Sequence, residues 1–146
     1  MSIPNKKTSY CTFRVNDLLF GVEVQQVQEV IRNQPTTRVP LAPGIISGLM
    51  NLRGQIVSAL SLRERLEMDG DDEIDKLMNV VVRSDEGPIS LLVDEIGDVV
   101  QVDPDLFEPP PETLRGVQRE LIHGAFKLED RLLLILDTDR VLEPAA

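Results

Sequence analysis

The chain contains the same strand–turn–strand–cap pattern twice, and this internal repeat limits its fold more than any other feature of the sequence. Residues 48–66 match residues 124–142 without a gap, at a constant offset of 76 positions. Within the match Ser61 aligns with Asp137, and both side chains can accept hydrogen bonds from the free amides at the start of a helix. Any two apolar hairpins resemble each other, but the matched caps favour a true repeat. The sequence therefore predicts two similar small units in tandem.

A second match supports the repeat at a different offset. Four residues align with similar residues 69 positions later in the chain. The aligned pairs are Val24 with Val93, Val27 with Ile96, Glu29 with Asp98, and Val30 with Val99. The change of offset is what a longer loop between the two matched blocks would give. The proline run at 109–111 is the natural place for that loop.

Short strands are expected throughout both units. Apolar and polar residues alternate between residues 10 and 15, as in a half-buried strand, and residues 16–17 indicate a hairpin turn. The spacing of Val24, Val27 and Ile31 instead predicts one short helix. Further strands are expected at 18–22, 48–52, 55–60, 77–83, 89–93, 98–102, 121–128 and 131–136.

Small strand-rich units usually close into barrels, because closure removes the unpaired strand edges that would otherwise aggregate. We therefore expect a mostly β fold with two tandem five-stranded barrels and short helices. In this interpretation residues 1–146 form a single domain. Its approximate sub-barrels are 9–76 and 77–146, with room for a strand or helix to be exchanged between them.

Charge and composition exclude several classes of partner. A formal net charge of -10 would repel a phosphate backbone, and no cluster of Lys and Arg offsets it, so nucleic acid is not expected as a partner. No apolar run is long enough to cross a bilayer, and no signal peptide is recognisable. The single cysteine, Cys11, excludes an internal disulfide framework and suits a reducing compartment. We expect a cytoplasmic protein without direct membrane insertion.

The sequence offers no set of residues for catalysis. His123 is the only histidine and falls in an expected strand, so a metal cluster or a nucleophile–histidine pair would lack its parts. Cys11 lies on the apolar side of its strand, where a cysteine behaves as a small hydrophobe. The acidic run 69–73 fails the test for an EF-hand loop, because Ile74 stands where the loop glycine belongs. We expect no enzymatic activity, no cofactor and no metal.

Five segments, read in order, resemble the signature of CheW domains, the coupling proteins of bacterial chemotaxis. The resemblance covers almost the whole chain, and the Asn-Leu-Arg-Gly element gains specificity from the motifs on either side of it. The sequence departs from the family pattern at Ser61, where the family usually has an acidic residue. The hydroxyl group of Ser61 can still cap the helix that follows. A partner contact that depends on a carboxylate at this position would be lost. The five segments are 20–22, 27–30, 39–43, 48–54 and 93–99.

The resemblance implies a fold and a function. The expected fold is two SH3-like barrels around a shared apolar seam. The expected function is that of an adaptor that couples the cytoplasmic tip of a methyl-accepting chemoreceptor to a CheA-type histidine kinase. The receptor would lie along the groove between the barrels, and the CheW-like domain of the kinase would pack barrel to barrel. The residues implied for the receptor groove or its walls are Val27, Glu29, Gly48, Arg53, Gly54, Ile96 and Val99.

Alternative readings stay open. Arg53 can equally be a turn residue whose guanidinium donates to nearby carbonyls, and the two glycines can serve backbone geometry alone. Val27, Ile96 and Val99 can be ordinary core residues. The same fold could serve another pathway, such as pilus motility, or more distantly bind a small ligand, and a structural oligomer is a further alternative. For an adaptor we expect a monomer when the protein is isolated.

Overall fold

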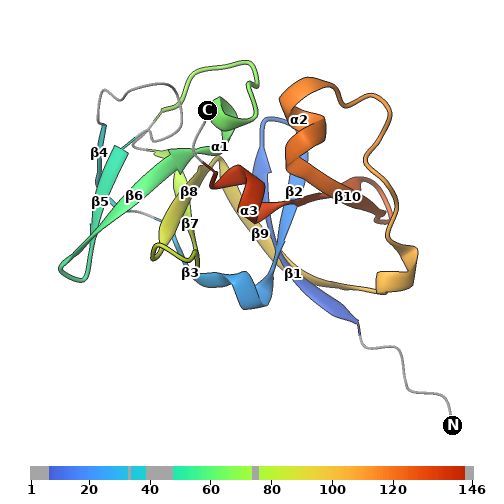
Figure 1. Cartoon of the computed structure of the whole chain (residues 1–146), viewed down its shortest axis with the longest axis horizontal. Helices are drawn as coiled ribbons and strands as arrows, with labels where there is room; N and C mark the ends of the chain where they lie inside the picture. Colours follow the sequence, from blue (N-terminus) through green and yellow to red (C-terminus); the bar gives the residue numbers. More distant parts are fainter. Residues whose placement is uncertain (1–6, 33, 39–47, 74–75, 144–146) are drawn as a thin grey trace, which may run out of the picture.

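Two β-sheets make up most of the protein in the computed structural model, which describes residues 7–32, 34–38, 48–73 and 76–143. Figure 1 shows the two sheets side by side, with short helices at their borders. The prediction of a mostly β fold with two small strand-rich units is confirmed. The family segment 39–43 lies outside the described residues.

The first sheet combines strands from both ends of the chain. Its order is β10-β11-β2-β1-β9, in which β2 pairs with β11 in parallel and the other pairs are antiparallel. A tight turn with a positive φ at Asn16 joins β1 to β2, as the sequence predicts. The strands are β1 (Thr8–Val15), β2 (Leu18–Glu23), β9 (Glu95–Val102), β10 (Ile122–Lys127) and β11 (Leu132–Leu136).

The second sheet is built from the middle of the chain. Its order is β3-β7-β8-β6-β5-β4, in which β6 pairs with β8 in parallel. It has six strands instead of the expected five, because a three-residue strand, β4, pairs with β5. The strands are β3 (Val27–Ile31), β4 (Thr36–Arg38), β5 (Gly48–Leu52), β6 (Gln55–Ser61), β7 (Met78–Val82) and β8 (Ile89–Val93).

The two sheets have the same strand order when β3, β7, β8, β6 and β5 are laid over β9, β1, β2, β11 and β10. The helices α1 (Leu62–Arg65) and α3 (Thr138–Val141) follow equivalent strands and lie 76 positions apart at both ends. As predicted, Ser61 and Asp137 cap them, because the amides of Glu64 and Arg140 each donate to the cap oxygen over 3.2 Å. The two helices also meet, because Arg65 donates to the carbonyl oxygen of Val141 over 2.9 Å.

Sheet membership does not follow the approximate border between residues 76 and 77. The strands before residue 24 pair with strands after residue 94, and those between residues 27 and 93 form the other sheet. The sequence expectation left room for such an exchange between its two halves. The domain boundaries themselves stay a prediction.

The main apolar core is shared by both sheets. Phe13 and Phe20 from the first sheet are fully buried together with Leu60 and Leu91 from the second, in one cluster that also takes in residues of the short helices. A smaller cluster around Tyr10 and the buried Phe126 belongs to the first sheet alone. Because the largest cluster crosses from one sheet to the other, the sheets pack as one unit.

The helix expected over residues 24–31 is wrong. Only a single 3-10 turn, η1 (Val24–Gln26), forms there, and β3 follows it directly. The helix α2 (Gly116–Leu121) was not predicted from the sequence. A short 3-10 turn, η3 (Pro104–Leu106), precedes the proline run at 109–111. The β-branched residues of 27–31 favour strand pairing with β7 over a helix.

Candidate functional site

Arg53 stands at the tip of the β5–β6 hairpin and forms an ion pair with Glu29 on β3. Both turn residues, Arg53 and Gly54, have a positive φ, which is the geometry of a type I′ hairpin turn. The side chain of Asn51 holds the turn by accepting a hydrogen bond from the Gly54 amide over 2.8 Å. The chain therefore presents the Arg53 side chain on a tight and well-defined turn.

The ion pair between Arg53 and Glu29 is bidentate. The two terminal nitrogens of Arg53 donate to the two carboxylate oxygens of Glu29 over 2.6 and 2.9 Å. The hydrogen bonds from Arg53 hold the pKa of the Glu29 carboxyl below its usual range, and that carboxylate in turn raises the pKa of Arg53. The Arg53 side chain is still 73% exposed. The guanidinium therefore has an internal partner and also faces solvent.

The pair also connects the two ends of the second sheet. Glu29 lies on β3, at one end of the strand order, and Arg53 directly follows β5, which is near the other end. The side chain of Gln34, which follows β3, likewise donates to the carbonyl oxygen of Asn51 over 2.6 Å. These two contacts bring β3 and the β5–β6 turn together, so the sheet curls toward a barrel.

Gly48 lies at the opposite end of β5, away from the Arg53 turn. A Cβ atom there would stand 2.6 Å from the carbonyl oxygen of Thr37 and 2.8 Å from the Thr36 methyl group, both on β4. Gly48 is buried beneath this strand. The close approach of β4 thus requires a glycine at position 48. This agrees with the interpretation that Gly48 serves backbone geometry, and a partner contact by Gly48 stays a prediction.

The three apolar site residues divide into two kinds. Val27 and Ile96 are partly buried and pack against the core shared by the two sheets. Val99 lies on β9 and is 59% exposed, so it is not an ordinary core residue. Val30, its equivalent in the 69-position repeat, is also exposed, at 46%. Sequence reasoning did not include Val30, although the repeat itself pointed to it.

The structure thus brings together Glu29, Arg53 and Gly54, and separately places Val27 and Ile96 on one core. Gly48 and Val99 lie apart from both groups.

The residues considered for catalysis have ordinary surroundings. Cys11 is half-buried, and burial raises the pKa of its thiol, which disfavours the reactive thiolate. His123 is largely exposed on β10, with its ring 5.7 Å from that of Phe107. Among the described residues, no three His, Cys, Asp or Glu side chains are placed to hold a metal ion. Nor does any helix in the described ranges have the length and apolar character needed to cross a bilayer.

Comparisons with known proteins match this chain over most of its length. The family model described as CheW-like domain matches residues 9–146. The chain is 33% identical to the chemotaxis protein CheW of Bacillus subtilis, over 90% of this chain and 84% of that one. It is 24% identical to the chemotaxis protein CheW of Treponema pallidum, over 97% of this chain and 85% of the other.

The fold also resembles a solved structure. The crystal structure of the scaffolding protein TtCheW from Thermoanaerobacter tengcongensis superposes with a TM-score of 0.83, covering 95% of this chain and 94% of that one. The two sequences are 24% identical. At that identity the match shows that the fold is shared.

Proposed function

Because the chain belongs to the family of CheW-like domains, we propose that it is a chemotaxis scaffold that couples a chemoreceptor to a CheA-type histidine kinase. The observation that carries this proposal is the extent of the family match, residues 9–146. The match includes both sheets, so every face that a bridging protein needs lies within the matched region. We further propose that the protein acts in the cytoplasm, is a monomer when isolated, and catalyses no reaction.

The receptor-binding surface in this proposal is built around the Arg53 turn. A helical receptor tip can lay an apolar stripe against exposed apolar residues, with a charged side chain fixing its register. In this proposal the Arg53–Glu29 pair supplies the charge, and the exposed Val30 and Val99, of which Val99 lies apart from that pair on the first sheet, supply apolar contacts to a long helical tip. Val27 and Ile96 lie behind this surface, where they contribute packing against the core.

The kinase would bind at the outer hairpins of the two sheets, at β10–β11 on the first sheet and along β6 on the second, next to the Arg53 turn. Ile56 on β6 and Leu132 on β11 are equivalent in the 76-position repeat, and both are exposed apolar residues. Beside Leu132 lies a cavity of about 260 Å³ whose lining includes Leu18 and Leu114. Two equivalent apolar faces suit head-to-tail contacts with a kinase domain of similar fold. Individually small interfaces of this kind hold through multivalency.

The proposal is tested by reversing the charge of Arg53. Arg53→Glu places two carboxylates opposite each other, and we expect capture of the receptor tip in a pull-down to fall strongly. Thermal unfolding followed by circular dichroism should change little, because exposed ion pairs contribute little stability. Capture of the kinase is the internal control and should fall less than capture of the receptor, because the face around Leu132 lies on the other sheet.

A charge swap separates the two roles of Arg53. The double variant Glu29→Arg/Arg53→Glu restores the internal ion pair with its polarity reversed. If Arg53 contacts the receptor, the swap leaves receptor binding weak. If the swap restores binding in full, or if Arg53→Glu collapses the melt, Arg53 is mainly structural and this receptor surface is wrong.

The pathway and the partners are identified by affinity capture from the native cells. Recovery of a CheA-type kinase and a chemoreceptor supports the chemotaxis function. Recovery of partners from pilus motility would assign the same scaffold to that pathway. Stabilisation of the isolated protein by a metabolite in a thermal-shift experiment would instead favour a small-ligand carrier.

A further inference from the structure

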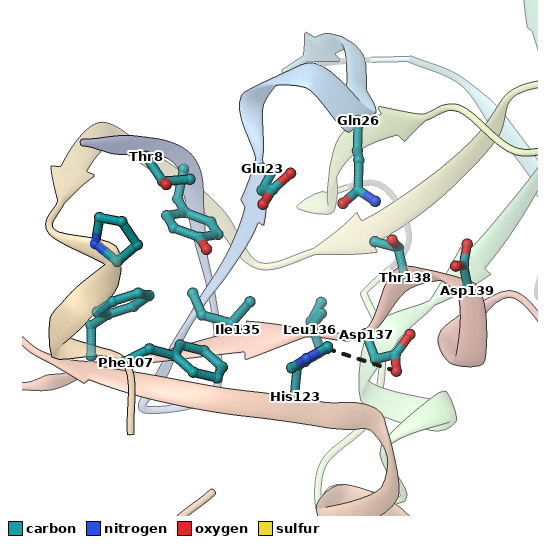
Figure 2. Close-up of a pocket in the computed structure, with 13 residues that line it drawn as sticks. Thr8, Glu23, Gln26, Phe107, His123, Ile135, Leu136, Asp137, Thr138 and Asp139 are labelled. Carbon is teal, nitrogen blue, oxygen red and sulfur yellow. Dashed lines mark ion pairs between the residues drawn. The ribbon is translucent and has the colours of Figure 1, made fainter. Parts of the chain in front are cut away.

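A cavity of about 380 Å³ opens on the first sheet, and none of the residues of the proposed receptor surface is in its lining. Figure 2 shows Phe107 at one end of this cavity and Asp139 at the other, with Glu23 and Gln26 facing the row formed by Ile135, Leu136 and Asp137. Its volume falls in the range of sites that accept a small molecule or one large side chain. None of its features is used by the function proposed above.

One wall of the cavity is aromatic. The ring of Phe126 lies 5.7 Å from that of Tyr10 and 5.3 Å from that of Phe107, at tilted or edge-on angles. Phe107 reaches this position because Gly124 leaves room for it, since a Cβ atom on Gly124 would coincide with the Phe107 ring. Aromatic faces of this kind attract organic cations.

The remaining polar wall is acidic, and Arg140, which pairs with Asp137 over 3.7 Å, offsets only one of its carboxylates. Three carboxylates line the cavity, on Glu23, Asp137 and Asp139, and no Lys or Arg is among the lining residues. Asp137 is already engaged, since it caps α3 and lies 3.9 Å from the Nδ1 atom of His123. Glu23 and Asp139 form no ion pair within the described part of the chain. Two carboxylates are therefore free to receive a cation.

Two residues in the lining, Tyr10 and Thr138, are buried overall but expose hydroxyl groups that have no partner among the described residues. Tyr10 is 6% exposed and Thr138 is 5% exposed, yet neither hydroxyl forms a hydrogen bond with any residue that the structure describes. Burial, and after it the nearby Glu23 carboxylate, raises the pKa of the Tyr10 phenol, so this group stays neutral and offers an oxygen lone pair to an N–H donor. Because both hydroxyl groups are accessible and unpaired, they can form hydrogen bonds with the polar head of a ligand that enters the cavity.

We propose that this cavity receives the guanidinium or ammonium group of an arginine or lysine side chain from a partner polypeptide. The aromatic wall packs against the aliphatic part and the charged head, while Glu23, Asp139 and the two free hydroxyls accept its hydrogen bonds. A free amino acid fits less well, because its α-carboxylate would meet acidic side chains and no lining Lys or Arg. The site extends the proposed scaffold by a third contact, one that recognises a basic residue.

The test uses N-acetyl-arginine N-methylamide, which carries the side chain without a free carboxylate. Added to the ¹⁵N-labelled full chain, it should shift the amide signals of residues around the cavity, such as His123, Phe126 and Asp139. The norleucine analogue, which has a similar length but no charge, should leave them in place. Free arginine should bind more weakly than the blocked form.

Substitutions assign the binding to this cavity. The double variant Glu23→Gln/Asp139→Asn should weaken binding about tenfold, and Tyr10→Phe should weaken it about threefold. The matched control, Glu67→Gln/Asp71→Asn, removes the same charge from exposed positions outside the lining of this cavity and should leave the affinity unchanged. Glu23 and Asp139 are both exposed, so we expect the double variant to keep the fold. The dispersion of the amide signals in its NMR spectrum checks this.

Three results would overturn the inference. The first is the absence of any shift at the cavity at high probe concentration, and the second is an equal response to the norleucine analogue. The third is an equal loss of affinity in the control variant, which would mean that net charge alone attracts the probe. Tighter binding of free arginine than of the blocked form would assign the cavity to a small molecule and reject a polypeptide partner. None of these outcomes depends on the receptor or the kinase, so they are distinct from a failure of the proposed function.

Discussion

Arg63, on α1, carries its charge into the interior between the two sheets. Its side chain is only 8% exposed and donates to Asp72 over 2.5 Å, to both oxygens of Asp94, and to the side chain of Asn16 over 3.2 Å. Burial alone would lower the pKa of Arg63, but the hydrogen bonds to Asp94 and Asp72 outweigh it, and the net pKa is raised. The acidic run 69–73, in which the sequence shows no EF-hand loop, is thus held in part by an internal ion network.

Removing the Arg63 charge should destabilise the protein strongly. Arg63→Met keeps much of the apolar stem but leaves two carboxylates without their partner, and we expect a loss of about 3–5 kcal/mol in the free energy of unfolding. The measurement is chemical denaturation. The control is Arg14→Met, which breaks a solvent-exposed pair with Glu95 and should cost less than about 1 kcal/mol. Equal losses in the two variants would refute the role of the buried network.

The Glu29 carboxyl gives a direct readout of the Arg53 contact. Its pKa is lowered in the folded state, so the ion pair is present above the unfolded-state pKa of a glutamate and is lost as the pH falls through the folded value. Carboxyl-carbon NMR should show Glu29 titrating below the usual range in the native protein. In Arg53→Gln its pKa should move back up. A titration that does not respond to the substitution would mean that the pair does not form in solution.

At the level of single residues, the sequence pointed to Glu29 and Arg53 through the family resemblance but could not show that they bind each other. They are 24 positions apart, and only the curl of the second sheet brings them together. The cavity on the first sheet was not foreseen either. Its lining comes from residues between Thr8 and Asp139, and no local pattern joins them.

At the level of elements, strands with clear alternation or with apolar runs between turn residues were predicted well. Both caps of the 76-position repeat are also confirmed, because capping is a local interaction readable from a few residues. The segment 24–31 was misread because Val27 and Ile31 satisfy a helical spacing and a strand preference at once, and pairing with β7 decides between them. The helix α2 gave no start signal, since it begins at a glycine and lacks a side-chain cap.

A substitution at Gly48 distinguishes backbone packing from partner contact at this element. In Gly48→Ala the new methyl group would collide with the backbone of β4, and we expect a loss of about 1–3 kcal/mol in the free energy of unfolding. Hydrogen exchange should also show faster exchange in β4 and at the start of β5. The neighbouring Leu49→Ala, whose side chain is exposed, serves as the control and should leave exchange in β4 unchanged. Weaker receptor binding by Gly48→Ala with full stability would instead make Gly48 a contact residue.

At the level of the whole molecule, the two sheets are related as circular permutants. The second sheet uses its strands in chain order from β3 to β8, whereas the first begins at β9, continues through β11 and returns to β1 and β2. The repeat in the sequence showed which segments are alike, but not which segments pair. For that reason the sequence could predict an approximate border near residue 76. It could not predict that strands from before this border pair with strands from after it.

The shared core predicts that the protein unfolds as one unit. Calorimetry should show a single transition whose calorimetric and van't Hoff enthalpies agree. The separate fragments 1–76 and 77–146 should show no cooperative melt, because the first lacks β9 and β11, which flank the β1–β2 pair, and the second lacks β3 and β6, which flank the β7–β8 pair. Two resolved transitions, or a folded fragment, would mean that the sub-barrels are independent domains.

The parallel pairing of β2 with β11 sets an order of events during translation. The ribosome releases the β1–β2 hairpin first, but β9 and β11, which flank it in the sheet, are not made until after residues 94 and 131. At bacterial elongation rates the hairpin therefore waits on the order of ten seconds for its neighbours. The second sheet, encoded entirely between residues 27 and 93, can close in the meantime. The oldest part of the nascent chain is thus among the last to be completed, and any early arrest of translation leaves that hairpin with both edges open.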